Sequence, residues 1–304
     1  AFGGDAPPGS PSYVADTEEF TGAGADIGAW ATGGNLNSAR DNLAGAGTQT
    51  AALAAGGHTP PGGYSADTEL YDGSSWTEVA NLNTGRAKIT GCGTQTAAIV
   101  FAGEDPGDSN TGATELWNGS GWTEVGDLNT ARKKVGGAGT STSGLAFGGT
   151  PGSKNETESW NGTAWTEVAN LNTARQGPGS AGSSNTSALA FGGYTNTYVA
   201  DTELWNGSGW TELNNLNQVR YVLGGSGTVS GALAFGGEIS PPTAKTEDWN
   251  GGSWTEVGDL NTARAALVGC GTPTATLAFG GEDPSGNLTE EWSGSSIASN
   301  VLTD

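Results

Sequence analysis

Short runs in which apolar and polar residues alternate extend along this chain, and no stretch shows the 3.6-residue period of an amphipathic helix. Residues 114–117 and 122–125 alternate with the two-residue period of a half-buried strand. Asn118-Gly119 between them favours a tight hairpin turn, because both residues tolerate positive φ. Upstream, residues 91–94 form a thin, glycine-rich strand and residues 97–101 an apolar run. We therefore predict four short strands within residues 91–125 and no helix.

This four-strand pattern recurs with a period of 43 to 46 residues, measured between successive arginines. Each unit has an apolar strand followed by Gly-Gly, then a Thr-Glu pair, and most units have a Trp with an Arg ten residues after it. Four strands per unit of this length are typical of a β-propeller blade. The repeated glutamates are Glu18, Glu69, Glu115, Glu158, Glu203, Glu247 and Glu290. The repeated tryptophans are Trp30, Trp76, Trp122, Trp165, Trp210 and Trp254, and the arginines are Arg40, Arg86, Arg132, Arg175, Arg220 and Arg264.

Counting the Thr-Glu pairs predicts seven blades in a single all-β domain over residues 1–304, with blades of about 44 residues. Only six first strands and six arginines are present, because residues 1–40 begin inside a second strand and residues 265–304 stop a few residues after the position of the seventh Trp. We expect an exchange between the termini to close the ring and remove its exposed edges. Either Asn300 to Thr303 supply the missing innermost strand, or the chain belongs to a longer one. The expected blades are residues 1–40, 41–86, 87–132, 133–175, 176–220, 221–264 and 265–304.

The order of these residues resembles the kelch repeat: an apolar strand with Gly-Gly, an aromatic strand, a Trp, and a segment ending in Arg. The resemblance covers essentially the whole chain and implies a kelch-type β-propeller. Trp replaces the usual Tyr of the third strand in most units, and Leu-Asn-Thr-Ala-Arg stands where kelch blades often carry prolines. Phrases such as Leu-Ala-Phe-Gly-Gly and Leu-Asn-Thr-Ala-Arg are also similar to repeats in marine bacteriophage proteins, tail-fibre-like ones among them.

Six ring-bearing residues stand outside the repeat positions and are candidate ligand-binding residues. Most of them lie in the loop between the second and third strands, where the distance from the repeated apolar strand to the Thr-Glu pair varies from 11 to 16 residues. In an up-and-down blade this loop and the inter-blade connection emerge on one face, and loops on a rigid scaffold commonly bind ligands. Alternatively, the tyrosines that precede the Thr-Glu pair by four residues only hold the base of the loop. The six are Tyr13, His58, Tyr64, Tyr194, Tyr198 and Tyr221.

The six arginines are predicted to be structural. Each stands at a fixed distance from a Thr-Glu glutamate and from a second glutamate in a Trp-Thr-Glu phrase, so we expect bidentate links between strands or blades. The second set is Glu78, Glu124, Glu167, Glu212 and Glu256.

Composition narrows the partners. With 32 acidic and 11 basic residues the net charge is −21, so no basic surface is available for nucleic acid or an anionic membrane. No apolar stretch approaches a membrane span. If the arginines are paired within the scaffold, five lysines are the only free cations and the surface is strongly anionic; they are Lys88, Lys133, Lys134, Lys154 and Lys245. The 54 glycines fit strand ends, turns and strands crowded around the axis.

The small number of histidines and cysteines limits the metal sites and disulfides that the chain can form. One histidine and two cysteines cannot build a zinc finger, an iron–sulfur site or a two-histidine copper centre. Cys92 and Cys270 occupy the same first-strand position in nearly opposite blades, too far apart for a disulfide, so we expect small buried thiols. Acidic loop residues are weak candidates for a calcium site, with solvated loops as the alternative; they are Glu104, Asp105, Asp108, Glu282 and Asp283.

These features favour a non-catalytic recognition or adhesion module, virion-associated or extracellular, that binds a cell-surface glycan or protein through the variable loops. Aromatic rims suit carbohydrates, because sugar C–H faces stack on them. The first alternative is a structural part of a phage particle whose loops touch a neighbouring virion protein. The second is an enzyme: the kelch propeller of galactose oxidase carries copper, but its site needs two histidines, and only His58 is present. We expect no cofactor.

Overall fold

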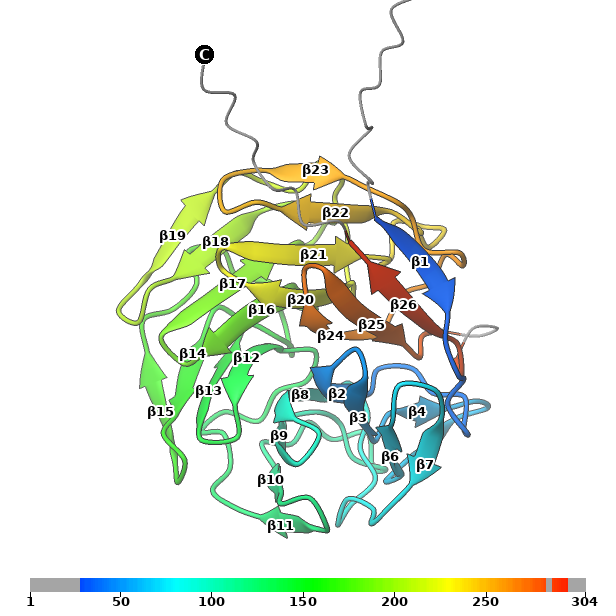
Figure 1. The fold of residues 1–304 in the computed structure, drawn as a ribbon. Coiled ribbons are helices and arrows are strands. Elements are labelled where there is room, and N and C mark those ends of the chain that lie inside the picture. Colours follow the sequence, from blue (N-terminus) through cyan, green and yellow to red (C-terminus); the bar gives the residue numbers. More distant parts are fainter. Residues whose placement is uncertain (1–27, 283–285, 295–304) are drawn as a thin grey trace, which may run out of the picture.

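The computed structural model describes residues 28–282 and 286–294, which form six four-stranded antiparallel sheets arranged around an axis (Figure 1). Blade 1 consists of β2 (Ala44–Thr48), β3 (Ala51–Ala55), β6 (Thr68–Tyr71) and β7 (Trp76–Glu78), and blade 2 of β8 (Thr90–Thr94), β9 (Ala97–Phe101), β10 (Thr114–Trp117) and β11 (Trp122–Glu124). Blade 3 consists of β12 (Gly136–Thr140), β13 (Ser143–Phe147), β14 (Thr157–Trp160) and β15 (Trp165–Val168).

The remaining blades repeat this up-and-down order, with the first strand of each blade innermost. Blade 4 consists of β16 (Gly179–Ser184), β17 (Ser187–Phe191), β18 (Thr202–Trp205) and β19 (Trp210–Leu213). Blade 5 consists of β20 (Gly224–Thr228), β21 (Gly231–Phe235), β22 (Thr246–Trp249) and β23 (Trp254–Glu256). Blade 6 consists of β24 (Val268–Thr272), β25 (Ala275–Phe279), β26 (Thr289–Ser293) and β1 (Ala29–Thr32). A two-stranded ribbon, β4 (His58–Thr59) and β5 (Gly63–Tyr64), extends a loop of blade 1.

A closed ring of backbone hydrogen bonds at the axis sets the number of blades. The residue two positions before each innermost strand donates its N–H to the carbonyl of its counterpart in the preceding blade, at 2.8–3.0 Å. Asn42 donates to Ala266, so the ring closes after six members. All six have φ between 45° and 56°, the left-handed region. The ring residues are Asn42, Lys88, Lys134, Gly177, Val222 and Ala266.

The prediction of seven blades is therefore wrong for the described chain. The described part of the first predicted unit contributes β1, which is the outermost strand of blade 6 and pairs with β26, with Trp30 opposite Trp292. Closure through the N-terminal part of the chain agrees with the expected exchange, but the strand exchanged is the outermost one, not the innermost. Residues 1–27, with Tyr13, and residues 300–303 lie outside the described residues. The number of blades follows the six first strands because only these meet at the axis.

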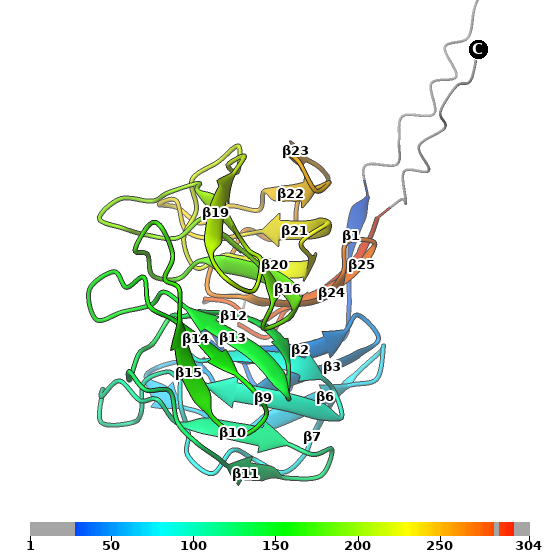
Figure 2. The same ribbon diagram turned by 90° about the vertical axis from the view of Figure 1, so that its left-hand side faces the viewer.

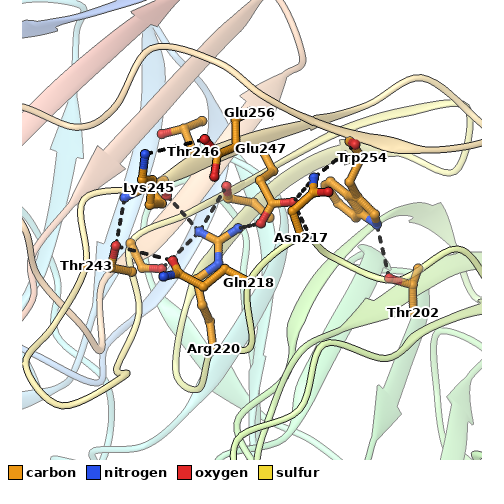
Figure 3. Close-up of polar contacts among 12 residues, drawn as sticks. Thr202, Asn217, Gln218, Arg220, Thr243, Lys245, Thr246, Glu247, Trp254 and Glu256 are labelled. Atoms are coloured by element: carbon orange, nitrogen blue, oxygen red, sulfur yellow. Dashed lines mark hydrogen bonds and ion pairs between the residues drawn. The ribbon is translucent and has the colours of Figure 1, made fainter.

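The repeated phrases form one buried polar network per blade, shown for blade 5 in Figure 3. Arg220 donates to Glu247 Oε1 at 2.7 Å, and Asn217 donates to Glu247 Oε2 through its backbone and side-chain nitrogens at 2.7 and 2.8 Å. The other terminal nitrogen of Arg220 reaches the carbonyls of Gly236 and Lys245. Burial lowers the pKa of Arg220, although Glu247 opposes the shift. The Leu-Asn-x-x-Arg phrase thus ties each inter-blade connection to the blade that follows it.

Each Arg ends one repeat unit and is buried against the Thr-Glu glutamate of the next unit. The geometry differs from the expected bidentate fork, because each Arg contacts one carboxylate oxygen and uses its other terminal nitrogen for backbone carbonyls. The second glutamates, Glu78, Glu124, Glu167, Glu212 and Glu256, are exposed and make none of these links. The pairs are Arg40–Glu69, Arg86–Glu115, Arg132–Glu158, Arg175–Glu203, Arg220–Glu247 and Arg264–Glu290.

Tryptophans join neighbouring blades. The indole N–H of Trp254 donates to the hydroxyl of Thr202 in blade 4 at 3.1 Å, and its ring lies edge-on to Phe191 at 5.0 Å. The indole N–H of Trp30 likewise donates to the hydroxyl of Thr246 in blade 5 at 3.0 Å. This contact is the one that the outermost strand of blade 6 should make to the preceding blade. The six equivalent donors are Trp30, Trp76, Trp122, Trp165, Trp210 and Trp254.

Glycine in the innermost strands is required by crowding, as the sequence indicated. A Cβ on Gly225 would stand 2.5 Å from the carbonyl oxygen of Ser180 in the preceding blade and 2.7 Å from the ring of Phe191. Those distances are far below van der Waals contact, so β20 can approach β16 only without a side chain at this position.

Replacing Arg132 by Met is expected to lower the free energy of unfolding by about 3–5 kcal/mol, because Glu158 keeps a buried charge without its partner. Urea denaturation of the variant measures this loss. The matched control is Lys154→Met, which removes the more exposed pair of Lys154 with Glu156 and should cost no more than about 1 kcal/mol. Equal losses in the two variants would contradict the structural role of the arginine.

Cys92 and Cys270 are free, buried thiols, and burial raises the pKa of each to about 12. The thiolate is the reactive form, so both thiols should resist Ellman's reagent in the folded protein at pH 8. In guanidinium chloride two thiols per chain should react at once. Rapid reaction of the folded protein would show that the blades open at these strands.

Candidate ligand-binding site at the mouth of the axial channel

Six backbone-paired positions, one per blade, lie next to the axial ring at one mouth of the channel. Long loops project from one side of the propeller in Figure 2. In blades 1 to 5, the residue that follows the glycine step pairs as a β-bridge with the residue just before the ring residue. The equivalent pair in blade 6 is Glu282 and Ala265, where the N–H of Glu282 donates to the carbonyl of Ala265 at 3.0 Å. The channel itself is a cavity of about 230 Å³ lined by the ring residues and the innermost strands. The bridged pairs are Asp41–His58, Ala87–Glu104, Lys133–Thr150, Gln176–Tyr194 and Tyr221–Glu238.

Three of the predicted tyrosines form one aromatic cluster at this mouth, made by blades 4 and 5. The ring centroids of Tyr194 lie 5.8 Å from Tyr198 and 5.6 Å from Tyr221, and those of Tyr198 and Tyr221 are 6.3 Å apart and nearly parallel. Ser153 of blade 3 donates to the carbonyl of Tyr194 at 3.1 Å, so the neighbouring loop supports the cluster. We name Tyr194, Tyr198 and Tyr221 the tyrosine cluster.

A missing side chain makes room for this cluster. A Cβ on Gly177 would stand 2.5 Å from the ring of Tyr221. Burial raises the pKa of Tyr221 to about 12, and burial together with Glu238 raises the pKa of Tyr198. These two hydroxyls stay protonated at neutral pH and can each donate and accept a hydrogen bond.

Three lysines lie on the side of blades 2 and 3. Lys88 and Lys133 both form ion pairs with the buried carboxylate of Glu104. Lys134 donates to the hydroxyl of Tyr221 at 2.5 Å, with its nitrogen 4.8 Å from the centre of that ring. Burial lowers the pKa of Lys134, and the charges of Lys88 and Lys133 lower it further.

The expectation that five lysines are free cations is wrong for four of them, which pair with carboxylates, whereas Lys134 contacts the hydroxyl of Tyr221. Lys154 pairs with Glu156 at 3.2 Å, and Lys245 lies 3.5 Å from both Glu256 and Asp259. The sequence could not show this, because the partners of the lysines lie in variable loops and on neighbouring strands.

Three carboxylates belong to the opposite side of the mouth, on blades 1, 5 and 6: Asp41, Glu238 and Glu282. Burial raises the pKa of Glu282, and the charges of Asp41 and Glu238 raise it further. Asp41 also lies 3.4 Å from Nδ1 of His58. The mouth therefore has a basic side and an acidic side, with the tyrosine cluster beside both.

His58 and Tyr64 are placed together but belong to blade 1, apart in sequence from the tyrosine cluster. They face each other across the β4–β5 ribbon with ring centroids 6.2 Å apart. Tyr64 donates to Asp108 in the adjacent loop of blade 2, and this contact raises the pKa of Tyr64 to about 12. These contacts support the alternative interpretation, in which Tyr64 holds loops in place and does not bind a ligand.

Three of the acidic residues considered for calcium, Glu104, Asp105 and Asp108, have other partners. Glu104 is neutralised by two lysines, Asp105 accepts the backbone N–H groups of Gly107 and Ser109, and Asp108 accepts from Tyr64. Asp283 lies outside the described residues. Among residues 28–282 and 286–294, no group of three or more His, Cys, Asp or Glu side chains is placed to hold a metal ion.

No protein-family model matches the chain, and no curated protein matches its sequence. The part of the chain that the structure describes has no helix that is long and apolar enough to cross a membrane. The argument for function therefore depends on the geometry of the channel mouth.

Sequence reasoning found the tyrosines but missed Lys88, Lys133, Lys134, Glu104 and Glu238 as members of the same site. A usable signal was present: Lys88 and Lys134 each stand two residues after a repeated Arg, the position that forms the axial ring.

Replacing Glu104 by Gln should cost about 2 kcal/mol of stability at pH 7, because Lys88 and Lys133 lose their shared carboxylate. Burial alone would raise the pKa of Glu104, but the hydrogen bonds from Lys133 and Lys88 hold it below its usual value. A carboxyl with a lowered folded-state pKa stabilises above the unfolded value of about 4.3 and loses this effect as the pH falls through the folded value.

The stability difference between wild type and Glu104→Gln should therefore be constant from pH 8 to 5 and shrink below about pH 4. Urea denaturation across this range measures it. Glu167→Gln, at an exposed position, is the control and should change little at any pH. A difference that stays constant down to pH 3 would show that Glu104 acts by packing and not by charge.

Proposed function

We propose that this protein is a non-catalytic recognition or adhesion module that binds a cell-surface glycan at the mouth of its axial channel. The observation that carries the proposal is the tyrosine cluster: three rings from two blades meet where the repeat itself uses no tyrosine. All three are partly exposed, so their faces and hydroxyls are available to a ligand.

The chemistry of the mouth suits a sugar. Tyrosine faces stack against the C–H groups of a pyranose ring, and such aromatic contacts are worth about 1 kcal/mol beyond burial. The protonated hydroxyl of Tyr198 and the carboxylate of Glu238 offer a donor and an acceptor for sugar hydroxyls. The hydrogen-bonded ring beneath them holds this arrangement before the ligand arrives, which reduces the entropic cost of binding.

We further assign the repeat to the kelch type of propeller, from the order of Gly-Gly, aromatic strand, Trp and Arg in each unit. Its similarity to phage repeats favours display on a virion, as in a tail fibre, or outside a cell. A surface protein is the alternative ligand on the same face.

A structural role in a phage particle is the other candidate. Stable assembly interfaces have an apolar core. Among the described residues Val219 is the one large hydrophobic side chain that is exposed. This surface favours reversible recognition over permanent assembly.

Tyr194→Ala and Tyr198→Ala should each weaken binding to the best ligand on a glycan array about tenfold, which corresponds to about 1.4 kcal/mol. Ser230→Ala, in the β20–β21 turn at the other end of the channel, is the matched control and should bind like wild type. Tyr64→Ala tests how far the site extends. If this variant binds the glycan like wild type, the binding site is limited to the tyrosine cluster. Absence of glycan binding, or binding that both tyrosine variants leave untouched, counts against the proposal.

A further inference from the structure

Lys134 differs from every other basic residue of the described chain with respect to its counter-ion. The six arginines and the other four lysines each lie within 4.0 Å of a carboxylate. Among residues 28–282 and 286–294, the ammonium of Lys134 contacts the hydroxyl and the ring face of Tyr221 and has no carboxylate within 4.0 Å, although its side chain is partly buried. A charge removed from water without a counter-ion is unfavourable, so this position favours the approach of an anion.

Neighbouring charges strengthen this preference. Lys88 has the largest Coulomb effect on Lys134 and, together with Lys133, lowers its pKa, whereas Glu282 and Glu104 oppose this shift. Glu104 is already shared by Lys88 and Lys133. Like charges at such range repel each other, and a bound anion would relieve the repulsion. Three lysines thus lie near one another in a protein whose net charge is −21.

Two of these three lysines lie at the axis. Lys88 and Lys134 are consecutive members of the hydrogen-bonded ring, and both line the channel cavity. The next member, Gly177, has no side chain, and the ring of Tyr221 packs against it, 2.5 Å from where a Cβ would stand. The backbone N–H groups of the ring are used within the ring, so an anion there must be held by lysine side chains.

We infer that the glycan bound at the mouth is an acidic saccharide, whose carboxylate binds Lys134 and Lys88 over the channel while a sugar ring stacks on Tyr194 and Tyr198. This inference rests on the proposed glycan-binding function and adds the class of sugar. The acidic side of the mouth sets the anion, because Asp41, Glu238 and Glu282 repel a doubly charged phosphate more than a carboxylate. The same carboxylates can accept protons from sugar hydroxyls.

The test is a glycan array of oligosaccharides containing uronic or sialic acid, printed beside their methyl esters and beside phosphorylated and neutral glycans. Wild type should bind the carboxylated members at least tenfold more tightly than their esters, and less tightly as NaCl rises. Lys134→Gln should lose this discrimination, Lys134→Arg should keep it because the charge remains, and Lys154→Gln should match wild type. Thermal unfolding of each variant checks that the fold is intact.

Three results would each overturn the inference. They are equal affinity for the esters and the acids, undiminished discrimination in Lys134→Gln, and a preference for phosphorylated glycans. The outcomes also separate it from the proposed function. Binding of neutral glycans that depends on Tyr194 but not on Lys134 leaves the proposed function standing and removes the acidic class. Absence of binding to every glycan overturns both.

Discussion

The hydrogen-bonded ring at the axis is the constraint on which the rest of the fold depends. Each member accepts from one neighbour and donates to the other, so none can be omitted without breaking two bonds. Five members are not glycine yet adopt the left-handed conformation, which costs an L residue about 1–2 kcal/mol. That cost is offset only when all six blades are in place. The ring therefore ties the local backbone conformation to the completed propeller.

The buried networks outside the ring explain the rigid spacing of the repeat. Replacing a buried ion pair by apolar groups is often neutral for stability, so such pairs are better understood as devices that specify one arrangement. Arg132 fixes the end of an inter-blade connection by binding Glu158 and two backbone carbonyls. The next two residues are Lys133 and Lys134, whose backbones then have little freedom. The structural arginines thereby position the residues of the candidate site.

How much could be predicted from the sequence follows from the range of each interaction. Local patterns that recur along the chain predict strands such as β10 (Thr114–Trp117) and the burial of Cys92. The count of blades was missed because Thr-Glu phrases mark third strands, whereas closure depends on which strands reach the axis. The pairing of Lys133 with Glu104 joins two blades through a variable loop, so no periodic signal records it.

The two ends of the channel differ in a way that bears on function. At one end, each turn between the first and second strands presents a hydroxyl residue, a variable residue and a second hydroxyl residue, as in Thr94-Gln95-Thr96 and Thr228-Val229-Ser230. At the other end, six equivalent backbone positions carry a different set of side chains. A symmetric scaffold needs no such asymmetry for its own stability, because the backbone ring is the same in every blade. An asymmetric mouth on a symmetric ring suits a ligand that binds in one orientation. The saccharide that we propose would place its sugar ring on blades 4 and 5, its carboxylate toward blades 2 and 3, and its hydroxyls toward the acidic side. The ring residues are Asn42, Lys88, Lys134, Gly177, Val222 and Ala266.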